Sequence, residues 1–172
     1  VEHPVTECVT GFDLVEWQLR VARGEPLPVD QSAIELNGHA IEVRLYAEDP
    51  AAGFLPSTGQ ISLFTMPQRD GLRVDTGVES GDEVSPFYDA MVAKVIAYGK
   101  TREDARLQLT SALSEIALLG PKSNRDFLID ALSREVFIEG AATTDFIAAH
   151  YGDRYVSHAV SETDLVAAAA IQ

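Results

Sequence analysis

The chain has 172 residues, of which 46% are hydrophobic, and its formal net charge is −14. This length fits one domain, or one domain with a piece of another, and the apolar content is sufficient for a core. The negative charge argues against a general nucleic-acid or anionic-membrane surface, and no apolar run approaches the ~20 residues that span a bilayer. The single cysteine, Cys8, excludes an internal disulfide and fits a reducing compartment. An acidic protein that handles anions must do so with a few placed arginines.

The first seven residues, Val1-Glu2-His3-Pro4-Val5-Thr6-Glu7, place two carboxylates, a histidine and a proline in one short segment. Chain ends are usually where disorder concentrates, so this chemistry leads us to expect a fragment of a longer protein. Two interpretations of Glu2 are open at this point. It could act as a general base, or it could be a solvated carboxylate in a segment whose turn is fixed by Pro4.

A helix is expected first. Between Asp13 and Arg23, apolar residues recur at helical spacing, and Gly24 is a natural stop. Residues 26–32, rich in proline and polar side chains, are typical of a connection between units.

Strands are expected next. His39 to Tyr46 alternates, with Ile41, Val43 and Leu45 on one face, which predicts a strand. Composition alone would allow residues 91–97 to be a helix or a strand, but Gly99 and the β-branched content favour a strand. The remaining segments with strand patterning, separated by turn residues, are 61–65, 72–75, 83–87 and 91–98.

Two helices close the region with clear patterning. Thr101 and Asp104 resemble a capping box with Asp in place of Glu or Gln, and an apolar stripe continues toward a stop at Gly120. Ser123 or Asn124 can cap a second helix. Strands followed by helices indicate an α+β fold, mostly an antiparallel sheet with helices. After about Tyr155 periodicity is lost, and we expect a flexible tail.

Arg44 stands out among the polar residues. It lies mid-strand on the face that it shares with Glu42 and Tyr46, where its planar guanidinium could bind a carboxylate, phosphate or enolate oxygen. The alternative is a structural pair of Arg44 with Glu42. Asp89 is similarly ambiguous, since loop aspartates are commonly caps or turn residues. The histidines predict no metal site, and no glycine-rich phosphate loop is present.

Several blocks of the sequence follow one another in a characteristic order. They are residues 1–7, Thr10-Gly11-x-Asp13-Leu14-Val15, Gln18-Leu19-x-x-Ala22-x-Gly24, Gly38-His39-Ala40-Ile41-Glu42-x-Arg44, Ala47-Glu48-Asp49-Pro50, Phe54-Leu55-Pro56-Ser57-x-Gly59, Tyr88-Asp89-x-Met91-x-x-Lys94, Gly120-Pro121-x-Ser123-Asn124-x-Asp126-Phe127-Leu128 and Thr144-Asp145-Phe146-Ile147. Taken together, these blocks resemble biotin carboxylase, the ATP-grasp component of biotin-dependent carboxylases. The last two blocks are most similar to the α subunits of acyl-CoA carboxylases of the methylcrotonyl- or propionyl-CoA type.

The resemblance implies a reaction in which ATP and bicarbonate are used to carboxylate N1 of protein-bound biotin. It assigns Glu2 as the general base that deprotonates bicarbonate and the backbone N–H of Val1 as a bicarbonate ligand. It assigns Arg44 as the arginine that stabilises the biotin enolate, which agrees with the need of a developing oxyanion for a fixed cation. Asp89 is a weaker candidate for the biotin pocket.

The resemblance also implies what lies outside this sequence. The ATP and Mg sites, the bicarbonate arginine and glutamine, and the biotin-accepting segment have no counterpart here, so we expect the 172 residues to be inactive alone. The implied domains are 1–30, the end of an ATP-grasp domain, then 31–155, the biotin carboxylase C-terminal domain, and 156–172, the tail. The implied partners are a biotin carboxyl carrier domain, a carboxyltransferase subunit and a second copy as a homodimer. The implied location is the cytoplasm, or the mitochondrial matrix in a eukaryote.

Two other hypotheses stay open. The chain could be a noncatalytic module that docks a biotinylated carrier or dimerises its parent. A different ATP-grasp ligase is disfavoured, because the blocks around Arg44 and Lys94 belong together in biotin carboxylases.

Overall fold

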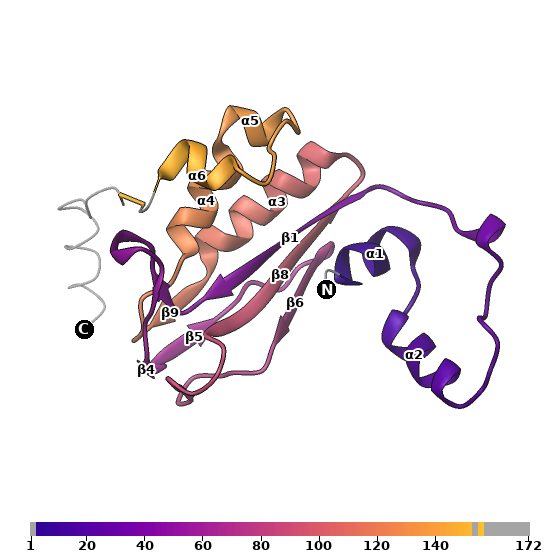
Figure 1. Ribbon diagram of the computed structural model, residues 1–172, viewed down its shortest axis with the longest axis horizontal. Coiled ribbons are helices and arrows are strands. Elements are labelled where there is room, and N and C mark those ends of the chain that lie inside the picture. Colours follow the sequence, from indigo (N-terminus) through magenta and orange to yellow (C-terminus); the bar gives the residue numbers. More distant parts are fainter. Residues whose placement is uncertain (1–2, 153–154, 157–172) are drawn as a thin grey trace.

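The computed structural model describes residues 3–152 and 155–156 (Figure 1). Helices and antiparallel strands are combined in one α+β fold, as the sequence predicted. The helices are α1 (His3–Thr10), α2 (Leu14–Ala22), α3 (Arg102–Glu115), α4 (Arg125–Ser133), α5 (Glu135–Ile138) and α6 (Phe146–Tyr151), with short 3-10 turns η1 (Gln31–Ala33) and η2 (Pro50–Ala52). The strands are β1 (His39–Tyr46), β2 (Glu48–Asp49), β3 (Leu55–Pro56), β4 (Gly59–Gln60), β5 (Leu63–Thr65), β6 (Leu72–Thr76), β7 (Glu83–Val84), β8 (Met91–Gly99) and β9 (Ala117–Leu119).

The central sheet has the strand order β1-β8-β6, with both pairs antiparallel. Val43 lies opposite Val95, which lies opposite Val74 on β6. Directly opposite residues share a face, so this row and its alternate neighbours form one aliphatic face. The predicted strand 39–46 and the choice of a strand at 91–98 are both confirmed.

Helix α3 covers the aliphatic face. Figure 1 shows α3 lying along β1 and β8. Its Leu109 and Leu113 are completely buried, as are Leu45 and Val95 of the sheet. The helix begins with the predicted capping box, in which the N–H of Asp104 donates to Thr101 Oγ1 (3.1 Å) and that of Thr101 to Asp104 Oδ2 (3.0 Å). The core of the molecule therefore sits between α3 and the sheet.

Helix α3 ends earlier than the sequence predicted. The stop expected at Gly120 is wrong, because the backbone becomes extended at Ile116, whose side chain is only 1% exposed. Residues 117–119 then form β9, which pairs with β5. Gly120 is needed for a different reason. Its φ is +122°, and a Cβ atom there would lie 2.1 Å from the carbonyl oxygen of Gln60, so this close approach requires glycine.

Helices α1 and α2 differ in how closely they approach the sheet, since Pro4 of α1 is buried whereas α2 has no buried residue. In Figure 1, α1 lies beside the central sheet and α2 projects away from it. The predicted helix between Asp13 and Arg23 is confirmed, since Asp13 caps α2 by accepting a hydrogen bond from the N–H of Glu16 (2.8 Å). No residue of α2 is buried, and its Leu19 is 59% exposed. Its apolar stripe thus contributes little to the core of this chain.

The strand expected at 83–87 is shorter in the structure, where β7 ends at Val84. Pro86 has no N–H to donate to a ladder, and Phe87 is 87% exposed. No helix in the described ranges is both long and apolar enough to cross a membrane. The tail predicted from 156 onward falls, except for Val156, outside the described residues.

Candidate functional site

A row of charged residues crosses the second face of the central sheet. Arg44 of β1 lies directly opposite Lys94 of β8, and Lys94 lies directly opposite Asp75 of β6. The next row on this face joins Glu42, Ile96 and Arg73. Arg44 and Lys94 are both half-buried. The strand that carries Arg44 is therefore ordered, and the alternation that places Val43 in the core turns Arg44 to the other side.

Helix α1 is tied to this charged face by Glu7. Glu7 Oε2 accepts a hydrogen bond from Arg73 Nη1 (2.6 Å), and its Oε1 accepts one from the N–H of Leu14 (2.8 Å). Arg73 also donates through Nε (2.8 Å) and Nη2 (2.9 Å) to the two carboxylate oxygens of Asp75. This network connects α1, the start of α2 and β6.

The same contacts set the charge state of Glu7. Burial acts to raise the pKa of Glu7, but hydrogen bonds from Arg73 and the N–H of Leu14, together with the charges of Arg73 and His3, lower it below its ordinary value. Asp75 and Glu7 in turn raise the pKa of Arg73. The charged forms of both partners are thus favoured under α1.

The carboxylate of Glu42, on the same face, is not fully hydrogen-bonded within the described residues. Its Oε2 is buried and has no hydrogen-bond partner among the described residues. Buried carboxylate oxygens normally have a partner, so this atom is an exception that asks for an explanation. A structural Arg44–Glu42 pair, the alternative considered from the sequence, would have supplied that partner.

Asn124 holds the end of β1 in place. Its side-chain Oδ1 accepts from the N–H of Tyr46 (2.9 Å), and its Nδ2 donates to the carbonyl oxygen of Arg44 (3.1 Å). Its own N–H donates to the carbonyl oxygen of Tyr46 (3.1 Å). Asn124 is only 4% exposed and immediately precedes α4, but its side chain makes no capping bond to that helix. The predicted capping role is therefore replaced by a contact with the strand of Arg44.

Two acids lie near this end of β1. Burial, with a contribution from the Asp89 charge, raises the pKa of Glu48, while a hydrogen bond with Asn124 acts to lower it. Asp89 itself is exposed, and its Oδ1 accepts a hydrogen bond from the N–H of Met91 (2.8 Å). This is the turn geometry that loop aspartates commonly adopt. The role of Asp89 in a biotin pocket stays a prediction.

The structure describes some of the predicted site residues and not others. Glu2 and Val1 lie outside the described residues. Arg44 lies on the ordered strand that the alternation predicted. The sequence predicted no site role for Lys94 or Asn124, because their positions beside Arg44 depend on pairings across 50 and 80 residues of chain.

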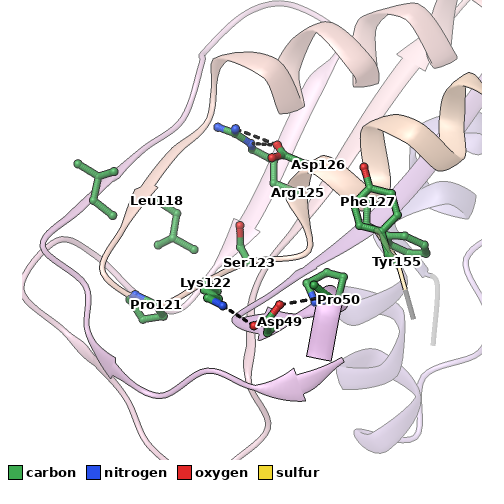
Figure 2. A pocket seen from close by; sticks show the side chains of 12 residues that line it. Asp49, Pro50, Leu118, Pro121, Lys122, Ser123, Arg125, Asp126, Phe127 and Tyr155 are labelled. Atoms are coloured by element: carbon green, nitrogen blue, oxygen red, sulfur yellow. Dashed lines mark hydrogen bonds and ion pairs between the residues drawn. The ribbon is translucent and has the colours of Figure 1, made fainter. Parts of the chain in front are cut away.

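A pocket of about 400 Å³ lies elsewhere, around the start of α4 (Figure 2). Figure 2 shows Lys122 and Asp49 joined to each other, and Arg125 joined to Asp126, beside the rings of Phe127 and Tyr155. Because its charged groups are paired with one another, the pocket has little to offer an ionic ligand. In the described part of the chain, no group of three or more His, Cys, Asp or Glu side chains could hold a metal ion.

Comparison with known proteins identifies the class to which this fold and charged face belong. The model of the biotin carboxylase C-terminal domain matches residues 42–149, so the chain belongs to this family, as its motifs predicted. Residues 1–30 match the ATP-binding domain of the carbamoyl-phosphate synthase L chain.

The similar proteins include subunits of a methylcrotonoyl-CoA carboxylase and biotin carboxylases. The mitochondrial methylcrotonoyl-CoA carboxylase subunit alpha of Mus musculus is 44% identical over 172 residues, which cover 99% of this chain and 24% of that protein. Biotin carboxylase 2 of Bacillus subtilis is 49% identical over 150 residues, 87% of this chain and 34% of that protein. The chain therefore spans only about a quarter to a third of such relatives.

Solved structures agree with the fold. The biotin carboxylase domain of a thermophilic 2-oxoglutarate carboxylase, bound to bicarbonate, has a TM-score of 0.86 at 39% identity, covering 91% of this chain and 35% of that one. The biotin carboxylase subunit of pyruvate carboxylase has a TM-score of 0.85 at 41% identity, covering 87% of this chain and 33% of that one.

Proposed function

We propose that this chain supplies the biotin-side part of a biotin carboxylase active site within an acyl-CoA carboxylase α subunit. The complete subunit would use ATP and bicarbonate to carboxylate biotin. The observation that carries the proposal is the position of Arg44, an arginine held on a rigid strand on the face opposite the core. A fixed guanidinium can stabilise an oxygen that becomes negative without the cost of reorganising in the transition state.

The arrangement around Arg44 supports this role. Asn124 bonds to the carbonyl oxygen of Arg44 and to both backbone groups of Tyr46, which fixes the backbone of the strand. Arg44 would then hold the urea oxygen of biotin as negative charge develops on it. Biotin supplies, when bound, the ureido nitrogen that accepts the carboxyl group.

The opening residues would complete the site. Glu2, next to the first residue of α1 in the sequence, would deprotonate bicarbonate, and the N–H of Val1 would help hold that ion. Asp89 would line the biotin pocket. Helix α1, which follows these residues directly in the sequence, is anchored over the face of Arg44 through Glu7 and Arg73.

The remaining components would come from outside these residues. ATP and Mg would bind to the rest of the ATP-grasp domain, of which residues 1–30 would be the end, while residues 31–155 would form the C-terminal domain. The partners would be a biotin carboxyl carrier domain, a carboxyltransferase subunit and a second biotin carboxylase. The compartment would be the cytoplasm or, as the names of the eukaryotic relatives suggest, the mitochondrial matrix.

Complementation tests this proposal. The purified 172-residue chain should show no bicarbonate-dependent ATP hydrolysis in the presence of free biotin. Addition of a separately produced preceding part of the biotin carboxylase should restore biotin carboxylation. Turnover by the chain alone would contradict the assignment of the nucleotide site to other residues. Binding of a biotinylated carrier without any restored carboxylation would favour the noncatalytic docking module instead.

A further inference from the structure

The pairing of Arg44 with Lys94 is unusual for a β-sheet. The two residues are directly opposite each other in the β1–β8 register and point to the same face. Cβ atoms in such pairs are about 5 Å apart, and like charges in this position destabilise a sheet. Neither side chain is fully exposed, so solvent screens the repulsion only in part.

The neighbouring carboxylates do not neutralise Lys94. Asp75 is directly opposite Lys94 on its other side, but both oxygens of Asp75 accept hydrogen bonds from Arg73. Among the described residues, the Lys94 ammonium makes no hydrogen bond or ion pair. Lys122, by contrast, pairs with Asp49 although it is far more exposed. Within the described residues, Lys94 is thus a cation beside Arg44 that makes no ion pair.

We propose that Lys94 is a positioning residue for Arg44, an inference that rests on the proposed function. Repulsion by the Lys94 ammonium disfavours the rotamers in which the Arg44 guanidinium lies across the sheet toward β8. The rotamers that remain favourable carry the Arg44 guanidinium away from β8, over the face of the sheet on which α1 lies.

Asp75 affects how strongly Lys94 repels Arg44. An ion pair between Asp75 and Lys94 would weaken the repulsion that Lys94 exerts on Arg44. The fork of Arg73 competes for Asp75, because it takes one acceptor position on each of the two carboxylate oxygens. The ion-pair network under α1 therefore competes with Lys94 for Asp75 in addition to anchoring the helix.

Kinetics of Lys94 variants in the complete carboxylase subunit test the inference. Lys94→Met should lower kcat for the carboxylation of free biotin about tenfold, the size expected of one screened charge at this range. It should leave biotin-independent ATP hydrolysis unchanged. Lys94→Arg, which keeps the charge, should restore most of the loss. Lys100→Met, which removes an exposed lysine just after β8, is the matched control and should have no effect.

A double-mutant cycle then separates positioning from other roles. If Lys94 acts through Arg44, Lys94→Met should cause no further loss in an Arg44→Ala background. Unchanged kcat in Lys94→Met, equal loss of both activities without rescue by Lys94→Arg, or a fully additive double variant would each overturn the positioning role. These outcomes leave the proposed function standing, whereas full biotin carboxylation by Arg44→Ala alone would contradict the proposed function itself.

Discussion

The two faces of the β1-β8-β6 sheet are made by the same strands but have opposite character. The face toward α3 is aliphatic, with Leu45 and Val95 completely buried. The face on the side of α1 carries a like-charge pair, Arg44 and Lys94, and a buried carboxylate oxygen of Glu42 that has no hydrogen-bond partner in the part of the chain that the structure describes. Neither feature helps the sheet to fold. The aliphatic face supplies stability to the sheet, and this allows the opposite face to carry charges suited to chemistry.

The largest expected effect on stability is on the aliphatic face. Leu113→Ala should lower the free energy of unfolding by ~2–5 kcal/mol, because it leaves a cavity between α3 and the sheet. Leu107→Ala is the matched control on the same helix, since Leu107 is 53% exposed. Urea denaturation measures both. Equal losses of unfolding free energy in Leu113→Ala and Leu107→Ala would show that the buried face of α3 stabilises the fold no more than its exposed face does.

Asn124→Ala should have the next largest effect. It leaves the N–H of Tyr46 and the carbonyl oxygen of Arg44 without side-chain partners, at a cost of ~1–3 kcal/mol in the free energy of unfolding. Amide hydrogen exchange should also show faster exchange of the Tyr46 N–H. Ser123→Ala, which alters the neighbouring residue, should change neither. Unaltered protection of the Tyr46 amide would exclude a role for Asn124 in holding β1.

Glu7→Gln should have the smallest effect on stability and a distinct pH dependence. We expect a loss of ~1 kcal/mol in the free energy of unfolding, because water screens the exposed part of Arg73. The pKa of Glu7 is lowered in the folded chain, so its contribution is present above the ordinary value of 4.5 and is lost as the pH falls through the folded value.

Chemical denaturation between about pH 3 and about pH 7 measures this contribution. The difference between the wild type and Glu7→Gln should vanish at the acid end of the range. Glu16→Gln removes an exposed pair with Arg20 and should change stability little. A difference between the wild type and Glu7→Gln that grows toward acid pH would contradict the assigned direction of the pKa.

The sequence predicted the parts of the molecule that depend on local pattern. Alternation located β1, and the capping box located the start of α3. The alternation along β1 also predicted the face on which Arg44 lies, because the residues between the aliphatic ones in a strand point to the opposite face.

The parts that the sequence did not predict depend on contacts between distant segments. Ser123 or Asn124 was expected to cap α4, since both residue types commonly do so, but Asn124 is the residue at the cap position and its side chain contacts the strand of Arg44 instead. The Glu7–Arg73 pair joins residues 66 positions apart. The pairing of Arg44 with Lys94 depends on the β1–β8 register, which no local pattern of either strand fixes.

The central claim is that the charged face exists for chemistry, and Arg44→Ala in the complete carboxylase subunit tests it most directly. Carboxylation of biotin and biotin-independent ATP hydrolysis should be measured on the same preparation, with Arg23→Ala, an exposed arginine at the end of α2, as the control. We predict that Arg44→Ala loses biotin carboxylation by ~100-fold or more while ATP hydrolysis and stability change little. An equal loss of both activities, accompanied by a loss of stability, would show that Arg44 is structural.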